Sequence, residues 1–318
     1  MRFALIPALL AASATSLFCA DQELLNLVMP NAHALAGANV QSAKNSTFGQ
    51  FVIGRMQDDK SLAKMIESTG FDPRRDLDEI LLGSTADVTS KSPASKSLAL
   101  VRGRFDANKI AAMAKTLTPM QVERRSGFDI YTSGQDKSGG FVFLTSTVAA
   151  AGDVASLREV IDRKMAGSKI SQDVAKRVQA ISASNDVWML SLVSASTFTG
   201  PFPTATRDSS PMHNVMSANM FRSLDQAAMG FHFAANSIEM NLETVSKTEK
   251  DATALADVVR MAANMVVLQR ENSELAILAN VFEAMKLNQQ AKTVSLRLAI
   301  PQSEIERIFD TGKSVRRI

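Results

Sequence analysis

The spacing of apolar residues along this chain predicts short strands and helices that follow one another with few long gaps. Apolar runs of strand length occur at 34–40, 79–84 and 97–105. After Asp106 and Asp153, both typical N-cap residues, apolar residues recur every three or four positions and indicate amphipathic helices. Further helices are predicted at 42–56, 58–68 and 171–182.

The middle and the end of the chain add more strands. Residues 122–152 predict three antiparallel strands joined by tight, glycine-containing turns. The run at 186–194 is apolar at odd and even positions alike, which predicts a central strand covered on both faces. Strands are also predicted at 227–235 and 237–245, and the second alternates apolar with polar residues, so one face of its sheet is solvated. Two helices at 248–270 and 273–286, a strand at 294–300 and a helix from Pro301 complete the prediction.

Two strands followed by a helix occur twice, at 128–165 and at 227–262. We therefore predict an α+β fold in which mostly antiparallel sheet packs helices on one face, with internal duplication of a ββα unit. A proline-rich loop at 196–211 separates an N-terminal α+β half at 21–195 from a C-terminal half at 212–318. The two halves are also compatible with one continuous domain.

Composition narrows the classes of protein. The chain has 318 residues, 46% of them hydrophobic and 21% charged, which is typical of a globular protein and argues against a polytopic membrane protein. The 35 Lys and Arg residues exceed the 32 Asp and Glu residues by only three. No block of positive charge is present, so nucleic acid is not a predicted partner.

The first twenty residues, MRFALIPALLAASATSLFCA, predict a secretory signal peptide and export to the periplasm or beyond the cell. Arg2 precedes an apolar run, small residues follow, and the next charge is Asp21. Small residues permit cleavage after Ala14 or after Ala20. We favour Ala20 because the charged chain begins at Asp21, although this choice places the bulky Phe18 three residues before the cut. The mature chain then has no stable membrane span.

The only cysteine, Cys19, lies inside this leader. Cleavage after Ala20 removes it, and the mature chain then has neither a disulfide nor a thiolate. Lipidation of Cys19 is an alternative that the preceding Leu17 and Phe18 fit poorly. An uncleaved anchor is another alternative, for which the charge-free stretch is of marginal length.

Four stretches resemble a group of exported bacterial proteins of unknown function. They are LLNLVMPNAHALAGANVQSAKNSTFGQFVIGRM, STGFDPRRDLDEILLGS, LALVRGRFDANKI and TSTVAAAGDVASLREVIDR. The resemblance would cover most of the mature chain. It implies export and an α+β fold, and it implies no activity, because none of the four stretches is a catalytic signature.

The strongest catalytic motif is Ser61-Leu62-Ala63-Lys64, an S-x-x-K pattern in which Lys64 would deprotonate the nucleophile Ser61. Residues 137–139 and 217–219 resemble the two companion elements of penicillin-binding proteins, but they occur in the reverse order. An envelope serine hydrolase is therefore kept as an alternative to a protein without catalysis.

Metal and cofactor signatures are missing from the sequence. His33, His213 and His232 form no H-E-x-x-H or H-x-H pattern, and there is no P-loop or G-x-G-x-x-G. The acidic run at 76–79 lacks the spacing of a calcium loop and predicts a solvated turn with local ion pairs. We expect no metal and no cofactor.

Methionine is enriched, with 16 residues against one Trp and one Tyr. Several methionines recur at helical spacing within 212–224, after a loop that contributes two phenylalanines. Thioether side chains repack easily, so this stripe suits a docking surface, and core packing is the alternative. The predicted docking residues are Phe198, Phe202, Met212, Met216, Met220, Phe221 and Leu224.

Together these features predict an exported, non-catalytic protein of the cell envelope that binds a partner or contributes to structure. Its partner is an unidentified envelope protein or an apolar ligand, docked through the Met-rich helix. Two alternatives remain: the serine hydrolase with Ser61 and Lys64, and a carrier that encloses an apolar ligand in a large interior cavity.

Overall fold

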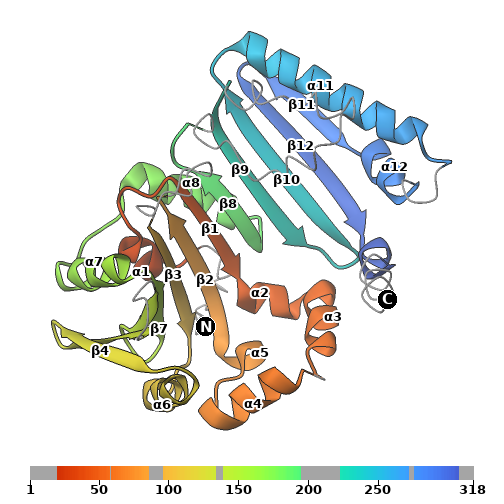
Figure 1. The fold of residues 1–318 in the computed structure, drawn as a ribbon. Helices are drawn as coiled ribbons and strands as arrows, with labels where there is room; N and C mark the ends of the chain where they lie inside the picture. The colour runs from red at the N-terminus through yellow and green to blue at the C-terminus, as the bar shows by residue number, and fades with distance from the viewer. Residues whose placement is uncertain are drawn as a thin grey trace, which may run out of the picture.

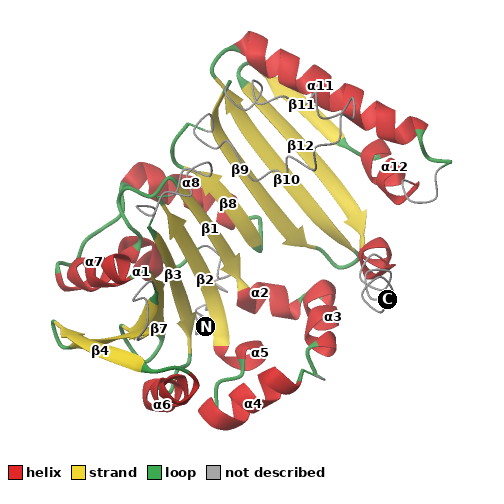
Figure 2. Ribbon diagram, in the orientation of Figure 1, coloured by secondary structure: helices red, strands yellow, loops and turns green. Residues whose placement is uncertain are grey.

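The structure is a computed structural model that describes residues 20–57, 59–85, 96–133, 139–194, 223–271 and 276–307. These residues form one twelve-stranded antiparallel sheet with helices packed against it (Figures 1 and 2). The strand order is β11-β12-β10-β9-β8-β1-β2-β3-β7-β6-β5-β4. The predicted α+β fold with an antiparallel sheet is confirmed, and both halves of the chain contribute to the same sheet through the pairing of β8 with β9.

The strands are β1 (Ala34–Asn39), β2 (Leu77–Ser84), β3 (Ser97–Gly103), β4 (Met120–Arg125), β5 (Phe128–Ser133), β6 (Gly140–Phe143), β7 (Val148–Gly152), β8 (Val187–Ser191), β9 (Leu224–Phe233), β10 (Ser237–Ser246), β11 (Lys286–Gln290) and β12 (Thr293–Pro301). The helices are α1 (Gln22–Leu27), α2 (Val40–Asn45), α3 (Thr47–Arg55), α4 (Lys60–Thr69), α5 (Pro73–Asp76), α6 (Ala107–Leu117), α7 (Val154–Met165), α8 (Gln172–Ser182), α11 (Glu249–Leu268) and α12 (Ala276–Glu283).

The N-terminal half buries one face of the sheet against α1, α7 and α8. Leu81 and Leu100 pair across β2 and β3 and are fully buried against Leu24 and Leu157 of the helices, within one continuous core cluster. Trp188 of β8 joins this core. Burying each such side chain contributes about 1.5–3 kcal/mol, so this cluster is the main source of stability in the N-terminal half.

The C-terminal half packs its helices on the opposite face. Trp188 lies opposite Gly230, and Gly230 lies opposite Asn241, so these three share the face of the N-terminal core. Leu242, one position along β10, points to the other face and packs in the cluster formed by α11, α12 and β12. Each half thus has its main core on one face of the sheet, and the two halves use different faces.

Local helix signals are confirmed where a side chain caps the first turn. Asp106, Asp153 and Thr248 each accept a hydrogen bond from a backbone N–H in the first turn of the helix that follows. The predicted helix at 42–56 is two helices, because the Ser46 side chain accepts from Gly49 N and starts α3 separately. The predicted helix at 273–286 is shorter, and β11 begins at Lys286.

Candidate functional site

Among the described helices, α1, α7 and α8 cover one face of the central strand β8. Trp188 and Leu190 are each only 3% exposed, as predicted for a buried central strand. Met189, which points to the other face, is 44% exposed. The predicted cover on both faces is therefore not met at Met189, because the described helices that pack on β8, namely α1, α7 and α8, all lie on the side of Trp188.

Met189 belongs to a row of apolar side chains that crosses five strands. The register places Met229, Met189, Ala36, Leu82 and Ala99 opposite one another on β9, β8, β1, β2 and β3. Leu82 is 47% exposed, which is unusual for a leucine in the middle of a sheet. The row is therefore an apolar strip in which Met189 and Leu82 are exposed and the other three residues are half-buried.

A second apolar row lies beside the first. It consists of Phe231, Val187, Ala38, Ile80 and Val101 on the same five strands, and all five are half-buried. None of the ten residues in the two rows is polar, and we call them the apolar sheet face. Contiguous exposed apolar surface of this kind marks interaction sites on soluble proteins.

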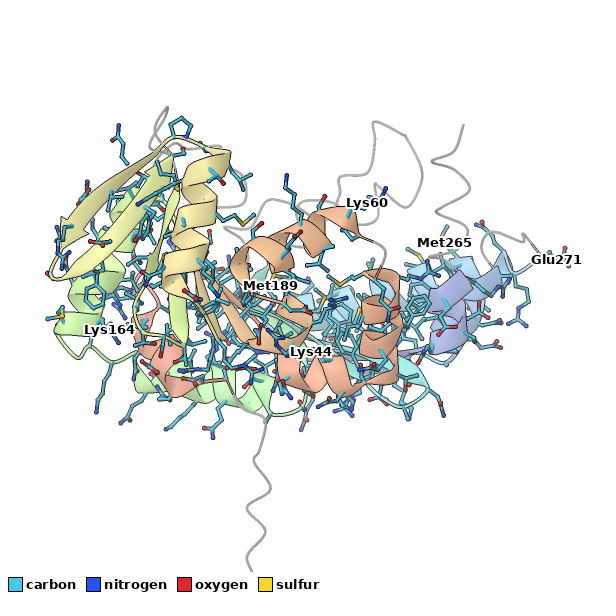
Figure 3. All side chains as sticks on the ribbon, turned by 90° about the horizontal axis from the view of Figure 1, so that it is seen from below. Lys44, Lys60, Lys164, Met189, Met265 and Glu271 are labelled. Carbon is cyan, nitrogen blue, oxygen red and sulfur yellow. The ribbon has the colours of Figure 1, made fainter. Side chains whose placement is uncertain are left out.

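Aromatic contacts tie flanking elements to the border of this face. Phe48 of α3 packs on Phe233 at the end of β9, with ring centroids 5.2 Å apart. Farther along the sheet, Phe71 packs on Phe105 at 5.5 Å, and Phe105 packs on Phe143 of β6 at 5.9 Å. Figure 3 labels Met189 together with Lys60 of α4 and Lys44 of α2.

A polar cleft of about 750 Å³ lies on the face of the sheet that carries Trp188, opposite the apolar sheet face. There α8 meets β9, β10 and β12. Strand β10 forms one wall of the cleft with the polar face that the sequence predicts for it. On that face Glu239 and Glu243 are exposed and Asn241 is half-buried. Polar and charged side chains that line the cleft are Asn39, Ser42, Arg177, Ser182, Ser184, Asn185, Asp186, Gln226, His232, Glu239, Asn241, Glu243, Ser295 and Arg297.

Asp186 joins three elements around this cleft, and its side chain is 7% exposed. It accepts hydrogen bonds from the Ser42 hydroxyl, from His232 Nδ1 at 3.0 Å and from the backbone N–H of Phe233 at 2.7 Å. Ser42 binds the carboxylate and not the imidazole, so the three side chains do not form the relay of a serine hydrolase, in which histidine lies between the other two. The arrangement joins α2, β8 and β9.

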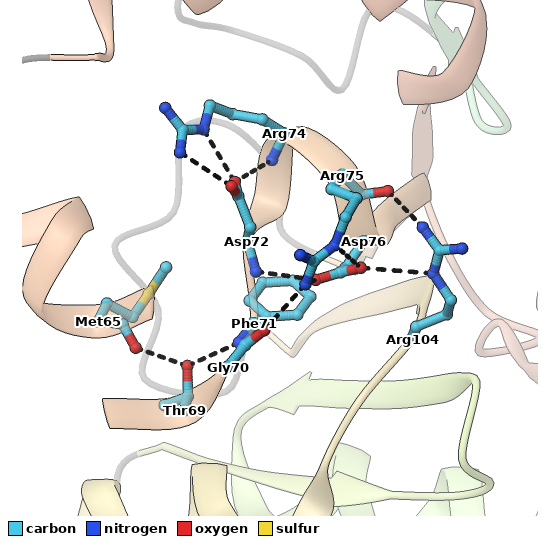
Figure 4. Close-up of polar contacts among 9 residues, drawn as sticks. All are labelled: Met65, Thr69, Gly70, Phe71, Asp72, Arg74, Arg75, Asp76 and Arg104. Carbon is cyan, nitrogen blue, oxygen red and sulfur yellow. Dashed lines mark hydrogen bonds and ion pairs between the residues drawn. The ribbon is translucent and has the colours of Figure 1, made fainter. Parts of the chain in front are cut away.

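The acidic run at 76–79 forms ion pairs, as predicted, but the predicted solvated turn is wrong, because Asp76 is buried and residues 77–79 lie in β2 (Figure 4). Arg75 donates to both oxygens of Asp76 at 2.8 and 2.6 Å, and Arg104 Nε lies 3.4 Å from Oδ1. The backbone N–H of Asp72 donates to Asp76 Oδ2 at 2.9 Å. The hydrogen bonds from Arg75 are the main reason that the pKa of Asp76 falls to about 2.

This network predicts an acid-sensitive contribution to stability. The pKa of Asp76 is lower in the folded chain than its ordinary value of 3.8, so its stabilisation is complete above pH 4 and is lost as pH falls through 2. Asp76→Ala should lower the free energy of unfolding by about 2 kcal/mol at pH 7. Urea titrations at pH 7 and pH 2 test this, because the difference between wild type and variant should shrink at pH 2. An equal difference at both pH values would contradict it.

The predicted hydrolase residues do not meet in a cleft. Ser61 and Lys64 lie on the first turns of α4, and both side chains are exposed. Neither is among the described residues that line the polar cleft. His213 lies outside the described residues. So do the companion elements at 137–139 and 217–219, except for Gly139.

The predicted docking residues fall mainly outside the described part of the chain. Leu224 is described, and it is a buried residue that opens β9, 4% exposed, and not the end of a helix. The others, Phe198, Phe202, Met212, Met216, Met220 and Phe221, lie outside the described residues. The apolar sheet face and the Asp186 contacts were not predicted from the sequence.

The described ranges contain neither a metal-binding cluster nor a helix that could span a membrane. No three His, Cys, Asp or Glu side chains there come together in a way that could hold a metal ion. No described helix combines the length and the apolar character needed to cross a membrane.

Comparisons with known proteins identify the fold. The sequence matches no family model and no curated protein. Two crystal structures of TP0453 are similar in fold. Crystal form IV has a TM-score of 0.50 and 7% identity over 90% of this chain and 95% of that one. Crystal form III has a TM-score of 0.50 and 8% identity over 90% of this chain and 97% of that one.

Proposed function

We propose that this protein is an exported, non-catalytic binding protein of the cell envelope that docks an apolar segment of a partner protein on its apolar sheet face. The observation that carries the proposal is the exposure of Leu82 and Met189, at 47% and 44%, in the middle of an apolar row. Export is inferred from the leader at 1–20.

The shape of the face favours a helix as the occupant. Ala36 and Ala38 make β1 a low floor between larger side chains on β8 and β2. An α-helix is about 10 Å across, and neighbouring strands are about 4.8 Å apart, so one helix spans β8, β1 and β2. A sheet face in a globular fold is normally covered by such a layer. The partner is therefore expected to supply an amphipathic helix.

The Met-rich stripe remains part of the proposal as a second docking element. Met216 and Met220 are its central residues, and changing both to Ser should weaken partner capture without a large change in Tm. A large fall in Tm would instead assign the stripe to the core.

A photo-crosslinking experiment tests the apolar sheet face directly. A photoreactive amino acid at Leu82, in cells that export the protein, should give an adduct with a discrete second protein. The matched control is Leu278 on α12, which is 43% exposed. Adducts at both positions in equal yield, or at neither, would contradict the proposal. An adduct with lipid in place of protein would favour the carrier alternative.

Two methionine substitutions test quantitatively whether the docking row binds the partner. Met189→Glu places a charge in the docking row and should reduce the yield of the Leu82 adduct about tenfold, because the partner would have to desolvate that charge. Met261→Glu on α11 changes a methionine of equal exposure, 44%, and should leave the yield unchanged. Equal losses in both variants would count against a specific site.

The hydrolase alternative has its own test. A fluorophosphonate probe or a fluorescent penicillin that labels the wild-type protein, but not Ser61→Ala, would overturn the non-catalytic assignment. The exposure of Ser61 and Lys64 on α4 leads us to expect no labelling.

A further inference from the structure

The backbone nitrogen of Asp21 points at a carboxylate. It lies 3.1 Å from Glu79 Oε1 and 3.2 Å from Oε2. Asp21 is also the N-cap of α1, whose Leu24, Leu25 and Leu27 are buried in the main core. The position of this nitrogen is therefore set by a well-packed helix.

Among the described residues, Glu79 has no strong cationic partner in the chain that retains Ala20. Burial is the main reason that the pKa of Glu79 is raised to about 7, and the nearby Asp21 carboxylate adds to the effect. Arg102 faces it from β3 and lowers that pKa only in part. The Arg102 guanidinium is already paired with Asp21 and Glu23, at 2.7 Å each.

An α-ammonium group would fit this place better than an amide. One amide N–H has a single proton for two carboxylate oxygens, whereas an ammonium has three protons and a positive charge. A chain that begins at Asp21 would carry such an ammonium on the atom that already contacts Glu79.

We propose that the leader is cleaved between Ala20 and Asp21 and that the new α-ammonium of Asp21 pairs with Glu79. Hydrolysis breaks the Ala20–Asp21 C–N bond; water supplies the hydroxyl of the new Ala20 carboxylic acid and a proton to the amine. This inference rests on the proposed export. Glu79 is then the ion-pair partner of the mature N-terminus.

The pairing has an energetic consequence for the fold. Cleavage removes the hydrogen bond from Ala20 N to Ser182 Oγ at 3.1 Å, and the new ion pair offsets that loss. Opposite charges in contact favour the ionised forms of both, so the pKa of Glu79 falls and that of the amine rises. Processing therefore stabilises the exported chain at neutral pH, whereas the precursor keeps a half-buried carboxylate that is poorly compensated.

The first experiment identifies the N-terminus of the exported protein. Expression of the complete chain in an exporting bacterium, followed by intact mass measurement and N-terminal sequencing, should give a chain that begins at Asp21. A chain that begins at Thr15, or at a lipid-modified Cys19, would overturn the inference. Retention of the precursor in the cytoplasm would instead overturn the proposed export.

The second experiment separates the ion pair from a merely structural role of Glu79. One chain begins at Asp21, and a control chain carries a Gly-Ser extension before Ala20, so that its amine is remote. Glu79→Gln should lower Tm by about 3 °C or more in the first chain at pH 7.5. In the extended chain it should leave Tm unchanged or raise it, because it removes a costly buried charge. The same change in both chains would overturn the pairing and leave export intact.

The pH profiles of the two chains should also differ. In the extended chain, the pKa of Glu79 lies above its ordinary value of 4.5, so stability should fall as pH rises from 4.5 past 7. In the chain that begins at Asp21, this fall should be absent. The other charged groups near the pair are Asp21, Glu23, Arg102 and Lys164, with Lys44 bound to the carbonyl oxygen of Leu77 on the same strand as Glu79. They are the same in both chains, so they cancel in the comparison.

Discussion

Trp188→Ala is expected to lower the free energy of unfolding by about 3–5 kcal/mol. Trp188 is 3% exposed and packs in the main core, where its ring covers Gly37 on the neighbouring strand. A Cβ atom at position 37 would lie 2.4 Å from that ring, so the two residues fit each other closely. Removal of the indole would leave a cavity that the adjoining strands cannot close without breaking their pairing.

Met189→Ala, one residue along the same strand, provides the contrast. Its side chain is 44% exposed on the apolar sheet face, so its removal should cost less than about 1 kcal/mol. Urea unfolding of both variants and of wild type measures the two values on one scale. If Met189→Ala were as costly as Trp188→Ala, the uncovered face would have to be part of a packed core, and the proposed docking site would be lost.

The features predicted correctly depend on short stretches of sequence. The caps at Asp106 and Asp153 and the alternation from Ile238 to Glu243 are encoded within a few residues, because a capping hydrogen bond and a two-residue period are local. The helix predicted up to 286 was too long, because the polar strand β11 lacks the apolar run that identifies strands. Strand order is not local: β1 lies between β2 and β8, which is about 150 residues farther along the chain.

The candidate site could not be found from the sequence for a related reason. The apolar run at 186–194 shows that both faces of β8 are hydrophobic, but it does not show which face the helices cover. The Asp186 contacts join residues 144 and 46 positions apart, and no motif links Ser42 and His232 to Asp186 across such distances. Glu79 and Asp21 are likewise 58 residues apart. The signal that was available is the leader, whose predicted cleavage after Ala20 places a free amine at Asp21.

Asp186 joins elements from both halves of the chain, so its removal is expected to destabilise the fold strongly. Its carboxylate holds the Ser42 hydroxyl of α2, the His232 ring of β9 and the Phe233 N–H. Asp186→Ala leaves the half-buried Ser42 hydroxyl and the half-buried Phe233 N–H without that acceptor, and each such loss costs about 1–3 kcal/mol. The expected loss in the free energy of unfolding is about 3 kcal/mol.

Hydrogen exchange locates this loss in the structure. Exchange of the Phe233 N–H should accelerate in Asp186→Ala, while exchange of Asp186 N–H, which donates to Phe231 O at 2.8 Å through the backbone, should change less. Glu239→Ala removes an exposed carboxylate opposite His232 on β10, and it should stay within about 0.5 kcal/mol of wild type. A loss below about 1 kcal/mol in Asp186→Ala, with Phe233 exchange unchanged, would mean that strand pairing alone holds β8 to β9.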